Sequence, residues 1–268
     1  MKPKINTKFN MSEFYNEQIN KHGYWWSGDY PTWDDAEKEC TGCSDESILE
    51  QVKNILLTTK DREDIYERDG CIIAGEPEYV FELLEWIKKT AINNEINLID
   101  FGGSLGTTFF QLKKYLKDYK VRWNIIEQEN FVTTGKEIFE DDNIKFYYTI
   151  DECLAETKPN CFISSSVFPY IKNTEEILTS VFDYKFDWIL LDRMSMIDGD
   201  KDRLSIQIVP PDIYKAIYPC WFFGEDKFIN YVVDNGYEHL KSFDALGGRG
   251  FAPRINTSAY RGYIFKKL

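Results

Sequence analysis

Apolar positions recur along the chain in two rhythms, which alternate from about residue 96 onward. Short apolar runs typical of buried parallel strands cover residues 96–101, 121–126, 144–149, 160–165 and 186–192. Helical spacing occupies residues 107–116, 173–182 and 226–235, and two closing strands are expected over 239–243 and 260–265. This alternation predicts an α/β fold, with a doubly wound, mostly parallel sheet of seven strands.

The first 94 residues lack this alternation and predict a helical extension. Thr32 or Asp34 can cap a helix that begins near residue 35, and further helices are expected from about residue 44 and over residues 77–91. Residues 23–33 are rich in aromatic and turn-forming side chains, which indicates either a small core or a lid over a bound ligand. We therefore expect an N-terminal extension, 1–94, and an α/β domain, 95–268.

The first strand of the α/β region ends in a glycine-rich turn, Asp100-Phe101-Gly102-Gly103-Ser104-Leu105-Gly106. A strand, a glycine turn and a helix together offer backbone N–H groups to a nucleotide-like ligand. The dinucleotide pattern G-x-G-x-x-G fails, because Ser104 and Thr107 stand where glycine is required, and no P-loop lysine follows. The pattern D-x-G-x-G-x-G fits, with Ser104 as its one departure. An ordinary strand-to-helix turn that needed small residues is the alternative.

Glu127 ends the next predicted strand. In a nucleotide-binding sheet, a carboxylate at this place accepts hydrogen bonds from both ribose hydroxyls, although a solvated charge at a strand end would look the same. Ligands of such sheets lie beyond the carboxyl ends of the strands, so residues after the other strands join the candidate site. The candidate cofactor-binding residues are Asp100, Gly102, Gly103, Ser104, Gly106, Glu127, Thr149, Asp151 and Ser164.

Composition and charge narrow the class of protein. The 268 residues carry a net charge of −13, which argues against nucleic acid as a partner, because phosphates require basic patches. No run of ~18 apolar residues predicts a membrane span, and the N-terminal residues lack an apolar signal core, so we expect a cytoplasmic protein. Six basic residues and one acid lie within residues 241–268, either as a solvated tail or as a rim that attracts an anionic substrate.

The sequence offers no convincing metal site. Of six cysteines, only Cys40 and Cys43 form a C-x-x-C pair, and neither a second pair nor a nearby histidine completes a zinc site. Disulfides are not expected in a cytoplasmic protein. The acidic run over residues 198–202 lacks the final glutamate of a calcium loop, so we interpret it as a solvated turn.

Several separated segments together resemble one family. They are YPTWDDA (30–36), YERDG (66–70), IDFGGSLG (99–106), SSSVFPYI (164–171), LDR (191–193), DRLSIQIVPP (202–211) and YPCW (218–221). The combination resembles the S-adenosylmethionine (SAM) dependent methyltransferases encoded with bacterial surface-polysaccharide genes, those for O-antigen and capsule. The resemblance spans about residues 24–243. It implies a class I, Rossmann-like methyltransferase fold, SAM as cofactor, and an acceptor in capsule or O-antigen synthesis.

Methyl transfer from a sulfonium is an in-line displacement, in which the protein mainly orients the acceptor. A hydroxyl acceptor benefits from a base, for which Asp192 and His239 are the candidates. Asp192 could instead bind a metal or pair with Arg193 at the strand end, and a structural role is the alternative for His239, as it is for His22. An ionised phosphate or phosphoramidate needs no base. The candidate substrate-binding residues are Arg193 and Arg203, which could clamp a phosphate, and Tyr170 and Gln207, which could orient an acceptor; surface ion pairs and packing are the alternatives.

We therefore expect a SAM-dependent O-methyltransferase. Its acceptor would be a capsule or O-antigen sugar, or a phosphorylated or nucleotide-linked precursor such as a phosphoramidate. The alternative is a non-catalytic protein of the same fold that binds a nucleotide-like ligand or a partner, because Ser104 replaces a glycine and no base is obvious. The glycine spacing disfavours an NAD-linked oxidoreductase.

Overall fold

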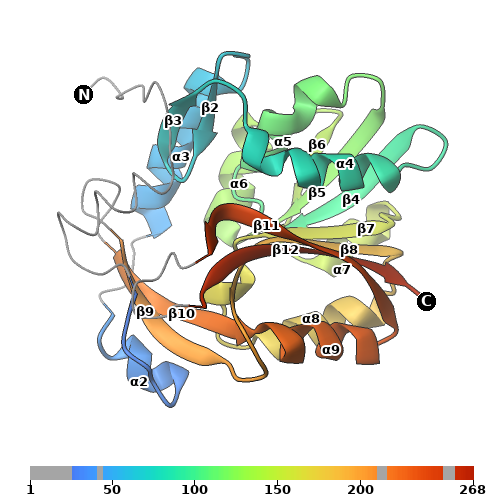
Figure 1. The fold of residues 1–268 in the computed structure, drawn as a ribbon. Coiled ribbons are helices and arrows are strands. Elements are labelled where there is room, and N and C mark those ends of the chain that lie inside the picture. Colours follow the sequence, from blue (N-terminus) through green and yellow to red (C-terminus); the bar gives the residue numbers. More distant parts are fainter. Residues whose placement is uncertain (1–25, 41–44, 210–215, 250–256) are drawn as a thin grey trace. The chain divides into compact units, whose positions relative to one another are not determined.

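The computed structural model describes residues 26–40, 45–209, 216–249 and 257–268 (Figure 1). They form two compact units. The first comprises Asp45–Ser165 and Trp188–Leu190, and the second comprises residues 26–40, Ser166–Asp187 and the described part of Leu191–Leu268. Among the described residues, no helix is long and apolar enough to span a membrane. Residues 45–94 belong to the same compact unit as the strands that follow them.

The first unit contains a sheet with the strand order β8-β7-β4-β5-β6, of which only the first three residues of β8 belong to this unit. The pairs β4/β5, β4/β7 and β5/β6 are all parallel. The apolar runs predicted from the sequence form these strands, because side chains buried on both faces require nearly continuous hydrophobic sequence. The strands are β4 (Glu95–Phe101), β5 (Lys120–Ile126), β6 (Ile144–Tyr147), β7 (Cys161–Ser165) and β8 (Trp188–Ile197).

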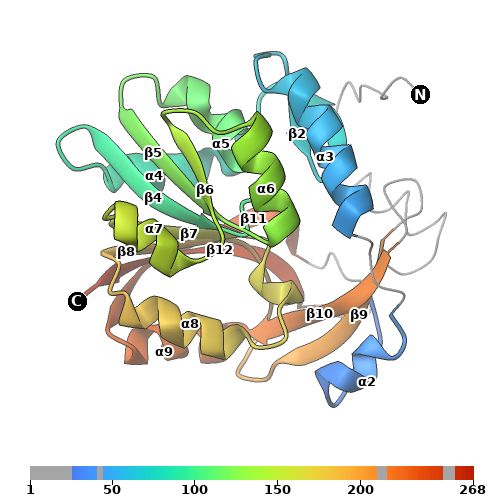
Figure 2. The ribbon, with the colours of Figure 1, turned by 180° about the vertical axis from the view of Figure 1, so that it is seen from behind.

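Helices lie on both faces of this sheet, as the α/β prediction requires. Figures 1 and 2 show α4 and α5 over one face and α7 over the other. The helix expected over residues 107–116 is α5 followed by a separate 3-10 turn, η2. The helical elements of the first unit are α3 (Asp45–Thr59), η1 (Glu78–Val80), α4 (Phe81–Lys89), α5 (Thr107–Leu112), η2 (Lys113–Tyr115), α6 (Glu129–Ile138) and α7 (Ile150–Glu156).

Between the helices of the segment before residue 94 lie two strands that the sequence did not predict. Strands β2 (Ile65–Arg68) and β3 (Cys71–Ala74) form an antiparallel hairpin. Its two-residue turn is Asp69-Gly70, with φ of 48° and 71°, the left-handed pair that such hairpins require. The hairpin joins the first unit through hydrogen bonds to α5, including one from Gln111 Nε2 to the Glu67 carbonyl oxygen at 2.6 Å. This contact explains why the hairpin belongs to the α/β unit rather than to a separate extension.

The second unit has a mixed sheet with the order β1-β9-β10-β8, and β12 pairs with both β11 and β8. Strand β10 is parallel to β8 and antiparallel to β9. The sequence did not predict β9 and β10 as strands. The remaining elements are β1 (Trp26–Ser27), α2 (Trp33–Glu37), η3 (Phe168–Tyr170), α8 (Thr174–Asp183), β9 (Arg203–Val209), β10 (Ala216–Gly224), α9 (Glu225–Asp234), β11 (Tyr237–Arg249) and β12 (Ala259–Lys267).

The described part of the aromatic N-terminal segment belongs to a small core. Thr32 is the N-cap of α2, since its hydroxyl oxygen accepts a hydrogen bond from the Asp35 N–H at 3.2 Å. Ala36 packs on Leu204 and Ile206 of β9. Of the two interpretations of this segment, residues 26–36 therefore support a core. Residues 23–25, like His22, lie outside the described residues.

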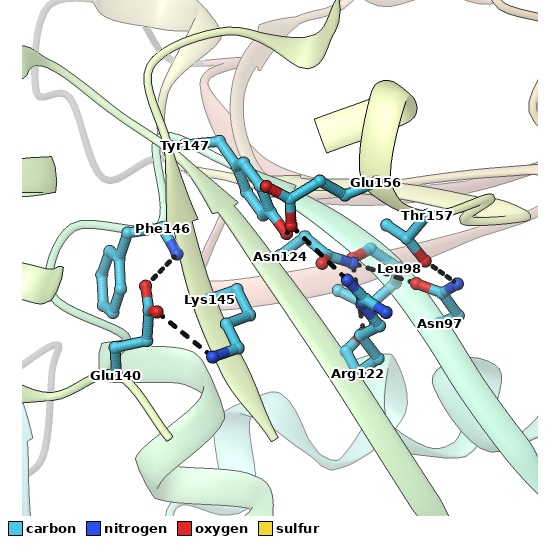
Figure 3. A network of polar contacts seen from close by, with 10 residues as sticks. All are labelled: Asn97, Leu98, Arg122, Asn124, Glu140, Lys145, Phe146, Tyr147, Glu156 and Thr157. Atoms are coloured by element: carbon cyan, nitrogen blue, oxygen red, sulfur yellow. Dashed lines mark hydrogen bonds and ion pairs between the residues drawn. The ribbon is translucent and has the colours of Figure 1, made fainter. Parts of the chain in front are cut away.

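A buried amide network fixes the register between β4 and β5 (Figure 3). Asn124 is fully buried, and its Nδ2 donates to the Leu98 carbonyl oxygen at 2.7 Å and to the Asn97 Oδ1 at 3.0 Å. Asn97 in turn donates to the Thr157 hydroxyl oxygen at 2.8 Å. A shift in register between the two strands would leave these buried polar groups without hydrogen-bond partners. The network thereby sets the two strands to end at the same level, with Phe101 opposite Ile126.

Candidate functional site

The glycine-rich turn after β4 is built from three left-handed residues. Gly102, Ser104 and Gly106 have φ of 71°, 54° and 94°. These are the three glycine positions of the D-x-G-x-G-x-G pattern, so Ser104 adopts the conformation that a glycine would take. A non-glycine residue in this region costs roughly 1–2 kcal/mol. The one departure from the pattern is therefore accommodated as local strain, and the path of the turn is kept.

The Asp100 side chain packs against the glycine-rich turn at Gly103. It is 1% exposed, and its Oδ2 accepts a hydrogen bond from the Trp123 indole N–H at 2.8 Å. A Cβ on Gly103 would lie 2.7 Å from the Asp100 Cγ and Oδ2, so only glycine allows this approach. The structure thus gives Asp100 a supporting role below the turn.

Glu127 lies beside the turn, at the end of β5. Its Oε1 accepts a hydrogen bond from the Ser104 N–H at 3.2 Å, and its Oε2 accepts one from the Gln128 N–H at 2.7 Å. The β4/β5 pairing continues to the turn itself, because the Gly102 N–H donates to the Ile126 carbonyl oxygen at 2.9 Å. The glycine turn and the carboxylate predicted to bind a ribose are therefore adjacent, at the carboxyl edge of parallel strands.

The remaining candidate cofactor residues follow neighbouring strands of the same sheet. Thr149 is the N-cap of α7, since its hydroxyl oxygen accepts from the Glu152 N–H at 3.1 Å. The Glu152 carboxylate accepts from the Tyr148 N–H, one residue before the N-cap, at 2.9 Å. Asp151 is exposed in the first turn of that helix. Ser164 is buried, and its hydroxyl donates to the Phe101 carbonyl oxygen at 3.1 Å, joining the ends of β7 and β4. Contacts of these residues with a ligand stay a prediction.

Sequence reasoning gave no role to Glu67, which the structure connects to the glycine turn. Glu67 is 2% exposed, and its carboxylate accepts hydrogen bonds from the Gly70 N–H at 2.9 Å and from the Thr107 hydroxyl. Thr107 is the first residue of α5, directly after the turn. Tyr79 donates to Gln111 Oε1 at 2.8 Å, and Gln111 donates to the Glu67 carbonyl oxygen. The sequence did carry a signal for this region, because the segment YERDG (66–70) places charged residues directly before an Asp-Gly pair that is typical of a hairpin turn.

In the second unit, Asp192 and Arg193 form a strained, charged pair within β8. Asp192 is 1% exposed, and the Arg193 Nε lies 3.7 Å from its Oδ2. The Asp192 carbonyl oxygen accepts from the Ser166 N–H at 2.9 Å. Both Ser166 and Arg193 are left-handed, with φ of 61° and 52°. Strain of this kind, at residues that are not glycine, is more common at functional sites.

The other candidate substrate residues also lie in the second unit. Arg203 Nη2 donates to the Gly28 carbonyl oxygen at 2.9 Å, and its Nε lies 4.0 Å from an Asp29 carboxylate oxygen. Gln207 is 6% exposed on β9. The rings of Tyr170 and Tyr218 meet edge to face, with centroids 5.2 Å apart. Residues 210 and 211, which end the family-like segment, lie outside the described residues.

His239 is placed away from Asp192. Its ring packs on Phe265, with ring centroids 5.3 Å apart, and its Nε2 lies 2.9 Å from the Ser242 hydroxyl. His239 of β11 lies opposite Phe265 of β12. Two residues farther along β12, the Lys267 N–H donates to the Asp187 carbonyl oxygen at 2.9 Å, and Asp187 directly precedes β8. Asp192 lies several residues farther along that strand. The structure therefore does not bring the two candidate bases together.

One residue of the proposed basic rim, Arg261, and one of the cysteine pair, Cys40, have partners within the second unit. The Arg261 Nε lies 3.1 Å from Glu225, and its guanidinium also bonds Asp244, so its charge is compensated. The Cys40 thiol donates to the Ala36 carbonyl oxygen at 3.2 Å. Cys43 and Arg254 lie outside the described residues. No group of three or more histidine, cysteine, aspartate or glutamate side chains in the described segments could hold a metal ion.

No protein-family model and no curated protein sequence matches this chain. Among solved structures, it is similar to a SAM-dependent methyltransferase from Clostridium acetobutylicum, with 9% identity, 72% of this chain and 92% of that chain covered, and a TM-score of 0.47. The glycopeptide N-methyltransferase MtfA, solved with SAM, shows 8% identity, 70% and 86% coverage, and a TM-score of 0.46. A 1,6-didemethyltoxoflavin N1-methyltransferase from Burkholderia thailandensis, solved with S-adenosylhomocysteine, shows 9% identity, 98% and 93% coverage, and a TM-score of 0.45. At these identities, neither substrates nor catalytic residues carry over.

Proposed function

We propose that this protein is a SAM-dependent methyltransferase. The observation that carries the proposal is the Glu127 carboxylate, which bonds the Ser104 N–H of the glycine turn at 3.2 Å at the carboxyl edge of parallel strands. A carboxylate in that place can accept both ribose hydroxyls of an adenosine, and the turn N–H groups lie next to it. Ser104 keeps the left-handed conformation of the pattern, so its presence does not favour the non-catalytic alternative.

The residues fit the cofactor chemically. When bound, SAM supplies an electrophilic methyl group on a positively charged sulfur. Glu127 would bind the ribose, and Gly103 lets the turn pack closely on Asp100, which would hold the turn in place. The seven strands expected of a class I methyltransferase would be β4 to β8 together with β11 and β12.

The acceptor side of the proposal rests on Asp192. We propose a hydroxyl acceptor, whose oxygen would form a bond to the methyl carbon as the carbon–sulfur bond breaks. Asp192 would take the proton that this hydroxyl loses and pass it to solvent. The family resemblance supports an acceptor in capsule or O-antigen synthesis. A phosphorylated acceptor would not need the proton transfer.

Calorimetry with S-adenosylhomocysteine tests the cofactor assignment. We expect binding by the wild type and a loss of about 10²–10⁴-fold in affinity for Glu127→Ala, since two hydrogen bonds to a charged group contribute about 1.5–3 kcal/mol each. Glu129→Ala is the matched control, because Glu129 is an exposed glutamate two residues away on α6. No binding by the wild type, or equal binding by both variants, would remove SAM from the proposal.

Radiolabelled methyl transfer tests the reaction. Glycan, nucleotide-linked and phosphorylated acceptors would be supplied with SAM, and the products identified by mass spectrometry. We expect Asp192→Asn to keep S-adenosylhomocysteine affinity and to lower kcat on a hydroxyl acceptor by about 10²–10⁴-fold. An Asp192→Asn enzyme as fast as the wild type would exclude Asp192 as the base.

A further inference from the structure

Strand β9 carries an unusual buried polar face. Leu204 and Ile206 point toward Ala36 on one side of the sheet, so the alternating residues Ser205 and Gln207 occupy the opposite side. The strand register extends this side onto β1 and β10, the neighbours of β9, and through β10 onto β8. We use the name polar face for Trp26 of β1, Ser195 of β8, Ser205 and Gln207 of β9, and Tyr218 and Cys220 of β10; Arg203 lies on the same side of β9, at the edge of this group.

These residues are contiguous within the second unit. Gln207 lies opposite Trp26 on one side and Tyr218 on the other, and Ser205 lies opposite Cys220. The Cys220 thiol interacts with Trp26, Ser195 and Tyr170, and burial raises its pKa to about 12. The polar face therefore runs from β1 to β8 as one group of side chains.

Two groups on the polar face lack a nitrogen or oxygen hydrogen-bond partner. Among the residues that the structure describes, the Ser195 Oγ and the Gln207 Oε1 have no partner of normal geometry, although Ser195 is fully buried and Gln207 is 6% exposed. The adjacent thiol is only a weak partner for Ser195. A buried polar group without a partner costs about 1–3 kcal/mol. Two such groups on one face are therefore better explained by a ligand that bonds them than by packing.

The charges beside this face indicate what kind of ligand it is. The Arg193 guanidinium is next to the Asp192 carboxylate, with its Nε at 3.7 Å, and the Arg203 guanidinium bonds Gly28 and approaches Asp29. Each guanidinium thus lies within 4.0 Å of a carboxylate, so both positive charges are compensated, while the buried Arg203 Nε keeps an N–H without a hydrogen-bond partner among the described residues. The polar face and its surroundings therefore offer a ligand no uncompensated charge: they offer a hydroxyl, an amide oxygen, one N–H donor and two half-buried tyrosine rings, Tyr170 and Tyr218.

We propose that the polar face is the acceptor subsite and that it binds an uncharged, polyhydroxylated ring, such as a sugar, rather than a phosphate. Hydroxyls of the ring donate to the Gln207 Oε1 and the Ser195 Oγ, and its apolar C–H edges lie against Tyr170 and Tyr218. The assignment of this ligand as the methyl acceptor rests on the proposed function. The binding of a neutral sugar does not.

Saturation-transfer NMR on the full chain, with S-adenosylhomocysteine present, tests this proposal. The probes are the methyl α-glycosides of glucose, galactose and mannose, each matched with the corresponding sugar 1-phosphate. We expect at least one neutral glycoside to bind the wild type, and to bind about tenfold more weakly to Gln207→Met and to Ser195→Ala, as the loss of one hydrogen bond predicts. Ser180→Ala, an exposed serine on α8, should bind like the wild type.

The melting temperature separates a ligand site from a structural one. Because Gln207→Met and Ser195→Ala remove unpartnered groups, they should leave the melting temperature unchanged or raise it. A large decrease would show that both groups have structural partners and would overturn the proposal. So would binding of the sugar phosphates alone, binding of no glycoside, or equal binding by all variants. Calorimetry with S-adenosylhomocysteine, done separately, distinguishes failure of the sugar site from failure of the methyltransferase assignment.

Discussion

The bond between Glu67 and Thr107 should couple the β2–β3 hairpin to the glycine turn. Glu67 is buried, and its carboxylate accepts from two donors, the Gly70 N–H at 2.9 Å and the Thr107 hydroxyl. Thr107 begins α5 one residue after Gly106. The informative substitution is Glu67→Gln, because it keeps the shape of the side chain and removes its charge.

The expected size of the effect follows from these two bonds. A hydrogen bond to a charged group contributes about 1.5–3 kcal/mol, against about 0.5–1.5 kcal/mol between neutral groups. Glu67→Gln keeps one oxygen for the Gly70 N–H and presents an NH₂ group to the Thr107 oxygen, so both contacts survive in weaker form. We expect a loss of about 2 kcal/mol in the free energy of unfolding, or a decrease in melting temperature of about 4–8 °C.

Urea unfolding and calorimetry measure the coupling through a double-mutant cycle. Thr107→Val removes the hydroxyl with little change in shape, and the cycle with Glu67→Gln should give an interaction energy of about 1 kcal/mol. S-Adenosylhomocysteine affinity should fall in Glu67→Gln, because the turn loses its anchor. The control is Glu63→Gln, since Glu63 is an exposed glutamate paired with Lys117 and should change stability by less than about 0.5 kcal/mol.

The reasoning would be refuted by two results. One is a Glu67→Gln protein as stable as Glu63→Gln, which would mean that the buried carboxylate makes no net contribution. The other is additivity of Glu67→Gln and Thr107→Val within about 0.3 kcal/mol, which would mean that the two side chains do not interact.

Three further predictions concern the turn and the buried thiols. Gly103→Ala places a Cβ 2.7 Å from the Asp100 carboxylate and should lower stability by about 1–3 kcal/mol and weaken S-adenosylhomocysteine binding; an unchanged melting temperature would show that Asp100 moves aside freely. Ser104→Gly should relieve the strain at φ 54° and raise stability by up to about 1 kcal/mol with cofactor affinity retained; a large loss of affinity would instead assign a ligand contact to the Ser104 hydroxyl. Burial raises the pKa of Cys153 and Cys220 from 9.0 to about 12, so native-state alkylation at pH 8 should be much slower than in urea, as peptide mass spectrometry would reveal. Because the folded-state pKa lies above the unfolded one, the stability that these thiols contribute is complete below about pH 9 and is lost as the pH rises toward 12; the slope of unfolding free energy against pH should flatten in Cys220→Ala, and an unchanged slope would contradict this.

The sequence determined the elements whose signals are local. The nearly continuous apolar runs of β4, β5 and β7 identify them as buried parallel strands wherever their partners lie. The glycine turn and Glu127 were found from spacing alone, because a turn conformation and a strand end depend on neighbouring residues. The Asp69-Gly70 turn carried a local signal as well, and it was overlooked within a segment interpreted as helical.

Only the tertiary structure decided which side chains meet. Thr32 rather than Asp34 caps α2 because of the path of the chain before the helix. Strand β9 was not recognised although its residues alternate between polar and apolar. That its polar residues Ser205 and Gln207 are buried could not be seen in the sequence, because burial on that side depends on partners distant in the chain. Asp192 and His239 looked equally suitable as bases, yet the pairing of β11 with β12 places the histidine near the start of β8. Spacing along the chain fixes conformation, whereas burial, charge pairing and unpartnered polar groups are properties of residues brought together by folding.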